Sequence, residues 1–317
     1  MADPQTLVIA HRGASGYLPE HTLEAKAYAH ALGADYIEQD LVATRDDQVI
    51  VIHDIHLDRV TNVASLYPDR HRDDGHYYAR DFDLAEIQAL ASGERRGNDG
   101  ETAAFPNRYP VGFGPFRIPT LREEVKLIQG LNQATGRIVG IYPEIKNPAW
   151  HRAEGVDLSS LVIDQLHDFG YRTKSDPVFL QCFDDAEVRR IRHDLGCPLK
   201  LVQLIGENSW GQADTNYDVL KTPEGLQEVA RTVDGVGAWI QHLVDTAGVD
   251  GQPVSTGFVK SAHEAGLVVH PYTFQVEQIG PGFESLPEMI AWFVDTLGVD
   301  GVFTDFPDLA LEGLGRT

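Results

Sequence analysis

Two histidines and an arginine stand at the ends of short apolar runs near the start of the chain. His11 and Arg12 directly follow the run LVIA, and His53 directly follows QVIVI. Because histidine titrates near pH ~6.5, His11 and His53 are candidates for a general acid and a general base. Arg12 offers a fork of donors that clamps an oxyanion, so the three residues together favour phosphoryl chemistry. Either histidine alone is equally consistent with a structural place at a strand end.

Three carboxylates and a lysine lie within two other apolar runs. Glu38 and Asp40 are two residues apart in YIEQDL. Glu144 and Lys146 have the same spacing in GIYPEIK, so each pair faces one side of its strand. Three carboxylates within ~4 Å of one another would repel by about 4 kcal/mol per pair at an effective dielectric of ~20. Arg12 and Lys146 could offset this repulsion in a salt-bridge network, but three hard oxygen ligands favour a divalent cation, Ca²⁺ or Mg²⁺.

These side chains converge only if the apolar runs are strands of one sheet. Runs rich in β-branched residues recur along the chain, and most are separated by stretches in which apolar residues have helical spacing. This alternation predicts βα units around a parallel sheet. The predicted strands are 7–11, 36–41, 48–53, 138–146, 178–183, 199–205, 236–240, 267–274 and 301–306. The clearest predicted helices are 121–131, 158–169, 184–195 and 285–297.

The second and third runs are an exception, because only ATRDDQ separates residues 36–41 from residues 48–53. A parallel crossover needs about a dozen residues or more, so these two runs predict a hairpin. The remaining strands match the α/β fold of a (β/α)8 TIM barrel, in which the carboxyl ends of the strands carry the active site. An open doubly wound sheet is the alternative that the count leaves.

Residues 55–118 break the alternation of strands and helices. They are polar, rich in Tyr, Arg, Asp and Gly, and end in FPNRYPVGFGPFRIP. A loop of this length inside a compact domain is usually a functional lid or a small subdomain. We therefore expect one insertion at the active face of the barrel, within a single catalytic domain that spans residues 1–317.

The composition excludes some partners. Lysine and arginine number 26 against 48 acidic residues, a net charge of −22, and no basic run could follow a phosphate backbone. Nucleic acid is therefore not an expected partner, whereas a bound metal is attractive on charge grounds. No window approaches the ~18 apolar residues that a membrane span needs. Cys182 and Cys197 have no CxxC spacing and give no disulfide framework, and nothing predicts the oligomeric state.

Several motifs, in order along almost the whole chain, resemble one enzyme family. They are HRGASGYLPEHTLEA, ADYIEQDLVATRDD, VIHDIHLDRVTNV, GIYPEIKNP, FLQCFD, LVQLI, VVHPYT and GVFTDFPD. These motifs resemble the glycerophosphodiester phosphodiesterases, particularly the periplasmic bacterial type. The resemblance implies a TIM barrel with an inserted segment and a divalent cation, which is calcium in the periplasmic type. It also implies cleavage of glycerophosphodiesters, such as glycerophosphocholine or glycerophosphoethanolamine, to glycerol 3-phosphate and an alcohol.

The same resemblance implies a role for each charged residue at a strand end. His11 and His53 would be the acid/base pair, and the glycerol 2-hydroxyl would attack to give a cyclic phosphate. Gln181, Phe183 and Tyr272, at other predicted strand ends, are further candidates for substrate binding, although a structural role is as well supported for each. Glu20, His21, Gln203 and Asp305 are polar neighbours of the same kind. The resemblance makes Arg12 and Lys146 ligands of the phosphate, and Glu38, Asp40 and Glu144 ligands of the metal.

Two other functions fit the same motifs. A related barrel phosphodiesterase acting on lysophospholipids shares HR, E-x-D and a second histidine, but no strongly amphipathic helix is evident near the insertion. A non-catalytic surface binding module would show degenerate site residues, and none is degenerate here.

The resemblance suggests a periplasmic or secreted protein whose precursor carries a signal peptide. A cytoplasmic location is the alternative, because the chain opens MADPQTLVIAHRG without such a leader.

Overall fold

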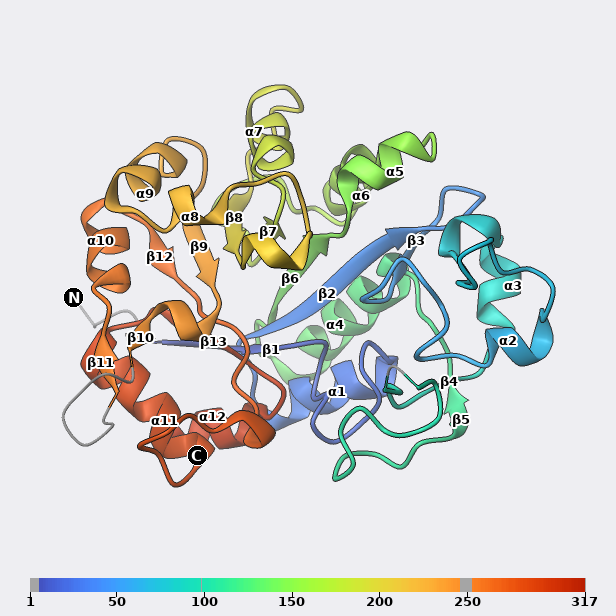
Figure 1. The fold of residues 1–317 in the computed structure, drawn as a ribbon, viewed down its shortest axis with the longest axis horizontal. Helices are drawn as coiled ribbons and strands as arrows, with labels where there is room; N and C mark the ends of the chain where they lie inside the picture. Colours follow the sequence, from blue (N-terminus) through green and yellow to red (C-terminus); the bar gives the residue numbers. More distant parts are fainter. Residues whose placement is uncertain (1–5, 98, 246–252, 317) are drawn as a thin grey trace.

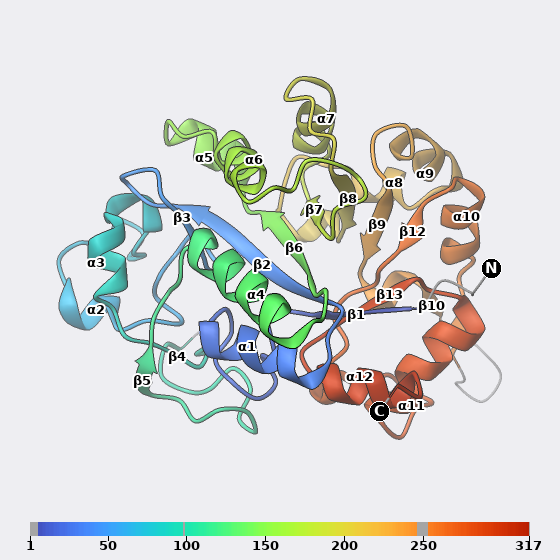
Figure 2. The same cartoon turned by 180° about the vertical axis from the view of Figure 1, so that it is seen from behind.

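The computed structural model describes residues 6–97, 99–245 and 253–316. Its centre is a nearly closed barrel of parallel strands, which hydrogen-bond in the order β12-β9-β8-β7-β6-β2-β1-β13 (Figures 1 and 2). All nine predicted strands are present. The barrel strands are β1 (Leu7–Ala10), β2 (Tyr36–Ala43), β6 (Gly140–Ile145), β7 (Phe179–Cys182), β8 (Lys200–Ile205), β9 (Gly235–Ala238), β12 (Val268–Val269) and β13 (Gly301–Thr304).

The barrel closes between β12 and β13. These two strands are joined by a few backbone hydrogen bonds rather than by a continuous ladder. Asp300 N donates to Val269 O, and Phe303 N donates to Pro271 O, each at 3.0 Å. These bonds bring the two ends of the sheet together. The TIM barrel predicted from the sequence is therefore confirmed, and the alternative of an open doubly wound sheet is wrong.

The ninth strand, β3 (Val49–Val51), pairs antiparallel with β2, so the predicted hairpin is confirmed. Val51 lies opposite Leu41, and Ile52 N donates to Asp40 O at 2.9 Å. The chain thus returns toward the middle of β2. This return places His53 beside the residues that β2 contributes to the active face.

Helices cover the outside of the barrel (Figures 1 and 2). In α4, Thr120 and Glu123 form a capping box, and Gly136 ends the helix in the left-handed region with φ 72°. All four predicted helices are confirmed, and the last continues into a π-helical turn at Phe293–Leu297. No helix in the described ranges is both long and apolar enough to cross a bilayer. The helices are α1 (Leu23–Leu32), α4 (Leu121–Thr135), α5 (Pro148–Ala153), α6 (Leu158–Asp168), α7 (Asp185–His193), α8 (Tyr217–Leu220), α9 (Pro223–Val229), α10 (Phe258–Glu264), α11 (Leu286–Trp292) and α12 (Pro307–Gly313).

Residues 55–118 connect β3 to α4 and form short elements beside the β2–β3 hairpin (Figure 1). Their apolar side chains, including Leu57, Phe82 and Leu90, form a cluster with Ile50 and Ile52 from the end of the hairpin. The segment therefore has a small core of its own, which packs on the end of the β2–β3 hairpin. Its elements are α2 (Val63–Leu66), a 3-10 turn (Ala79–Asp81), α3 (Leu84–Gln88), β4 (Ser92–Gly93) and β5 (Phe113–Phe116).

The interior of the barrel changes from apolar to polar toward the carboxyl ends of its strands. Ile9, Tyr142, Phe179, Val202 and Phe303 pack together inside it. Inward-facing residues recur every second position along a strand, so the next inward position lies closer to the active face. Two positions after each of these apolar residues, except Val202 of β8, the side chain is polar. These polar residues are His11, Glu144, Gln181 and Asp305. The barrel thus supports a polar site on an apolar floor.

A buried ion pair joins α1 to α4 next to this site. Lys26 is 0% exposed, and its Nζ lies 3.4 Å from Glu124 Oε2 and also donates to the carbonyl of Glu38. In Lys26→Met, Glu124 would be left buried without its cation, and we expect the free energy of unfolding to fall by about 3 kcal/mol. This loss is at the low end of the range for breaking a buried ion pair. Burial raises the pKa of Glu124 to about 7, so in the variant the carboxylate takes up a proton and is no longer a buried charge.

Urea denaturation of the single variant and of Lys26→Met/Glu124→Leu measures this effect. The double variant should recover most of the loss, since an apolar pair of similar volume replaces the ion pair without leaving a charge behind. A single variant as stable as the wild type would show that the pair contributes nothing.

Candidate functional site

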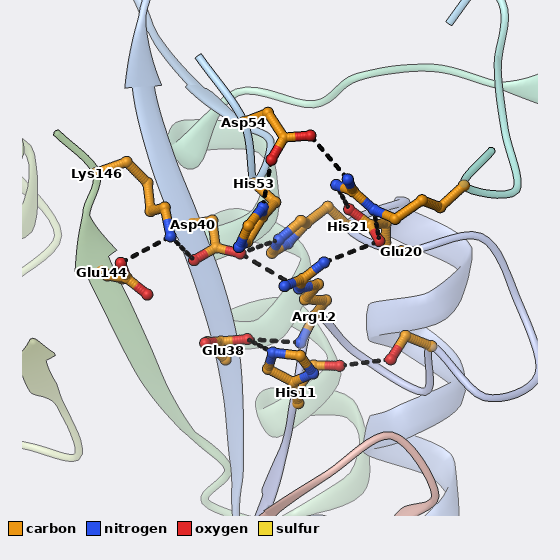
Figure 3. Close-up of polar contacts among 12 residues, drawn as sticks. His11, Arg12, Glu20, His21, Glu38, Asp40, His53, Asp54, Glu144 and Lys146 are labelled. Carbon is orange, nitrogen blue, oxygen red and sulfur yellow. Dashed lines mark hydrogen bonds and ion pairs between the residues drawn. The ribbon is translucent and has the colours of Figure 1, made fainter. Parts of the chain in front are cut away.

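The residues that the sequence predicted as a site line one cavity of about 260 Å³. They come from β2, β6 and β7 and from the segments that follow β1, β3, β6, β7 and β12. Figure 3 shows most of them as they face one another. The structure therefore brings together the whole predicted set, whose chemical roles stay predictions. The set is His11, Arg12, Glu38, Asp40, His53, Glu144, Lys146, Gln181, Phe183 and Tyr272.

Three buried carboxylates form the acidic centre of the cavity. One oxygen from each of Glu38, Asp40 and Glu144 lies within 4.8 Å of the others. Lys146 Nζ is 2.8 Å from Glu144 Oε1 and 3.8 Å from Asp40 Oδ1. Asp40 Oδ1 is nonetheless buried without a hydrogen-bond partner. One lysine thus leaves an unsatisfied oxygen among these carboxylates.

The electrostatics of the cluster are compatible with a bound cation. Burial, with the nearby Asp40 adding to it and Lys146 opposing it, raises the pKa of Glu144 to about 8. Burial likewise raises the pKa of Glu38. Burial acts in the same direction on Asp40, but Lys146 and His21 outweigh it and hold the pKa of Asp40 well below its usual range. Hard oxygen donors at this spacing could hold a divalent metal ion, and a cation among them would keep all three ionised.

His11 is oriented by a carboxylate behind it. Its Nδ1–H donates to Asp305 Oδ1 at 2.6 Å, and Nε2 lies 3.9 Å from Glu38 Oε2. Asp305 also accepts from Gln275 Nε2 at 2.7 Å and pairs with Arg108. Although burial opposes it, His11 and Arg108 lower the pKa of Asp305 to about 2. We assign the proton to Nδ1, which leaves Nε2 of His11 free toward the cavity.

His53 has the same arrangement on the other side of the cavity (Figure 3). Its Nδ1–H donates to Asp54 Oδ1 at 2.6 Å, and the other oxygen of Asp54 accepts from Arg95 Nη1 at 2.7 Å. Burial together with the positive charges of Arg12 and Lys146 lowers the pKa of His53 to about 4. At neutral pH this imidazole is therefore uncharged, and its Nε2 is ready to accept a proton.

Arg12 is held by its backbone as well as by its side chain. Its φ of 58° lies in the left-handed region, and its N–H donates to Glu38 Oε2 at 2.7 Å. The guanidinium donates to Glu20 Oε2 at 3.0 Å and lies 3.5 Å from Asp40 Oδ2. Burial alone would lower the pKa of Arg12, but Glu20 and Asp40 outweigh it and the pKa is raised. Arg12 is thus a fixed positive charge, and its Nε is buried without a hydrogen-bond partner.

The other three predicted residues line the cavity and also contact residues around it. Gln181 Nε2 donates to Glu38 Oε1 at 3.3 Å, so it orients a carboxylate of the cluster. Phe183 places its ring 5.9 Å from Lys146 Nζ, and Tyr272 donates its hydroxyl to the Ile205 carbonyl at 2.9 Å. All three also line the cavity.

Two polar neighbours that the sequence marked lie behind the site. His21 Nε2 lies 2.7 Å from Asp40 Oδ2 and supports that carboxylate. Gln203 is buried and donates to backbone carbonyls, including that of Phe183 at 2.9 Å. Glu20 and Asp305, the other two, hold Arg12 and His11 respectively.

Sequence reasoning missed several residues of the site. Arg95 and Arg108 reach it from the insertion, where no strand or helix pattern marks them. Trp210 and Trp239 line the cavity with their rings 5.2 Å apart. Trp239 could have been predicted from the sequence, because it directly follows β9 and the carboxyl ends of barrel strands carry the site.

Fold and site together describe a TIM barrel whose cavity gathers two histidines, three carboxylates and two fixed cations. The chain belongs to the Glycerophosphoryl diester phosphodiesterase family, whose match covers residues 11–309. It is therefore a member of a family of enzymes that hydrolyse glycerophosphodiesters.

Relatives agree with this assignment, and solved structures share the fold. The chain is 43% identical to the glycerophosphodiester phosphodiesterase of Haemophilus influenzae, over 97% of this chain and 89% of that protein. It is 35% identical to the one of Treponema pallidum, over 98% and 92%. A glycerophosphoryl diester phosphodiesterase structure from Silicibacter pomeroyi shares the fold with a TM-score of 0.71 at 22% identity, over 98% of this chain and 94% of that one. A phosphodiesterase from Oleispira antarctica, solved with its product sn-glycerol-3-phosphate, has a TM-score of 0.66 at 20% identity, over 98% and 97%.

Proposed function

We propose that the chain hydrolyses small glycerophosphodiesters, such as glycerophosphocholine and glycerophosphoethanolamine, to glycerol 3-phosphate and an alcohol. The observation that carries this proposal is the pair of carboxylate-backed histidines, His11 and His53, which line one cavity together with Arg12 and Lys146. Two proton carriers and two fixed cations are the groups that transfer of a phosphoryl group needs. The product bound to the Oleispira antarctica phosphodiesterase belongs to the same reaction class.

The acidic cluster is the proposed place of a divalent cation, held by Glu38, Asp40 and Glu144. The resemblance to the periplasmic type favours Ca²⁺ over Mg²⁺. When bound, the cation would offset phosphoryl charge and lower the pKa of a coordinated hydroxyl. The unpartnered oxygen of Asp40 and the raised pKa values of the two glutamates support this proposal.

The side chains of this protein provide the remaining chemistry. Arg12 and Lys146 would bind phosphoryl oxygens, because both stay protonated in the cavity. One histidine removes the proton of the glycerol 2-hydroxyl, whose oxygen bonds to phosphorus while the bond to the departing alcohol breaks. The other histidine enters this step with a second proton on Nε2 and gives that proton to the departing alcohol. Water then opens the cyclic phosphate with the two histidines in reversed roles, which yields glycerol 3-phosphate.

We also propose how the chain is organised and where it acts. Residues 55–118 would be an insertion within a single catalytic domain that spans the chain, since Arg95 from this segment contacts both Glu20 and Asp54 at the barrel. The resemblance to the periplasmic bacterial type supports a periplasmic or secreted location. The reading frame of the encoding gene tests this location through the presence or absence of a signal peptide.

Hydrolysis of glycerophosphocholine with calcium, coupled to detection of glycerol 3-phosphate, tests the proposed function. We expect turnover that is proportional to enzyme concentration, because the two histidines, the two cations and the three carboxylates line one cavity. A lysophospholipid of the same headgroup, assayed in parallel, should be hydrolysed far more slowly. Turnover of the lysophospholipid alone would replace the proposal with the lipid reaction, and turnover of neither would favour a binding module.

A further inference from the structure

A second cavity of about 240 Å³ opens beside the first. The two share His11, Arg12, His53 and Gln275, so both reach the groups that act on the phosphate. The acidic cluster lines only the first cavity. A phosphodiester carries one substituent on each side of its phosphate, and the two cavities offer one space for each.

Most charges that line the second cavity are already paired. Arg95 is held between Glu20 at 2.6 Å and Asp54 at 2.7 Å. Arg108 pairs with Asp305 and Glu277, at 2.7 and 2.8 Å. These pairs neutralise one another, whereas Arg59, a further cation of the lining, donates its Nε–H to the Arg96 carbonyl at 2.9 Å.

Glu94 is different from these residues. It lines the second cavity at the end of β4, is only 4% exposed, and has its Oε2 buried without a hydrogen-bond partner. It forms no ion pair with any cation in the described part of the chain. Burial, together with the nearby Glu20, raises the pKa of Glu94 to about 7, whereas Arg95 and Arg108 oppose the shift. A buried carboxylate oxygen without a donor is costly, and a donor or cation that entered the cavity would satisfy it.

We propose, resting on the proposed function, that the second cavity binds the departing alcohol and that Glu94 selects alcohols that carry an ammonium group. The glycerol arm belongs in the first cavity, because its 2-hydroxyl must reach the acidic cluster that lines only that space. The alcohol arm then extends past His53 and His11 toward Glu94. An amino alcohol places its ammonium at the far end of this arm, where the carboxylate accepts a charge-assisted hydrogen bond.

The test compares two diesters of similar size, glycerophosphoethanolamine with a cationic headgroup and glycerophosphoglycerol with a neutral one. In Glu94→Gln, which keeps the shape and removes the charge, kcat/KM for glycerophosphoethanolamine should fall by about tenfold. The value for glycerophosphoglycerol should change by less than about twofold. Glu101→Gln removes an exposed carboxylate of the same insertion and should leave both values unchanged. An equal loss on both substrates, or no loss on either, would overturn the proposal.

A second measurement uses only the wild type and so does not depend on the folding of a variant. Ethanolamine should inhibit hydrolysis at a concentration about tenfold lower than ethylene glycol, which has the same length but no charge. Equal inhibition by the two would overturn the role of Glu94 while leaving the proposed function intact. A wild type that turns over neither diester would overturn the proposed function, and the assignment of this cavity with it.

Discussion

Replacing His11 or His53 by alanine is expected to lower kcat for glycerophosphocholine by about 10²-fold or more, with a much smaller change in KM. Each imidazole would carry a proton in the transition state rather than bind the ground state, and a general acid or base typically contributes ~10² to 10⁴ in rate. Steady-state kinetics with detection of glycerol 3-phosphate measures the loss. Circular dichroism and thermal unfolding show whether each variant keeps its fold.

His71→Ala is the matched control, since His71 is an exposed histidine of the insertion that lines neither cavity. It should retain wild-type kcat. The carboxylates behind the two catalytic candidates give a finer test: Asp54→Asn and Asp305→Asn keep each side chain's size but no longer stabilise a protonated imidazole. Both asparagine variants should have a lower kcat than the wild type, and the loss should not exceed that of the matching histidine-to-alanine variant. A histidine variant that turned over at the wild-type rate would remove that residue from the reaction.

The positions of the strand-end residues were predictable because they follow from local rules. Period two along a strand places Glu38 and Asp40 on one face, and a parallel barrel collects its carboxyl ends in one place. The short connection before β3 is equally local, and it moves His53 back beside Asp40. Patterns that span only a few residues of the sequence were therefore enough to predict that these side chains lie close together.

The partners of these residues were harder to predict because they depend on distant parts of the chain. Arg95 lies 41 residues from Asp54 and 75 from Glu20 in the sequence. Its segment has no regular periodicity from which its direction could be inferred. Lysine side chains are mostly exposed, yet Lys26 is fully buried against Glu124. Only tertiary packing decides whether such a charge faces water or a carboxylate.

Removal of divalent cations by a chelator is expected to abolish hydrolysis, and calcium in excess should restore it. The three carboxylates lie within 4.8 Å of one another, and neither Lys146 nor Arg12 satisfies Asp40 Oδ1. Without a cation the phosphate would meet the negative charge of Asp40, whose pKa stays low, at the place where it must bind. Activity that survives exhaustive chelation would contradict the metal site.

Cation binding also has a readout that does not depend on activity. A ligand that binds only the folded state stabilises it by about 2.7 kcal/mol at a free concentration of ~100 times Kd. The thermal unfolding temperature of the wild type should therefore rise as calcium is added, and magnesium tested in the same way compares the two ions. Asp40→Asn and Glu144→Gln should remove most of this rise, because each deletes a charged ligand, whereas Glu101→Gln should keep it. If calcium stabilised the ligand variants as much as the wild type, the cation would bind elsewhere, and the loss of activity on chelation would need another cause.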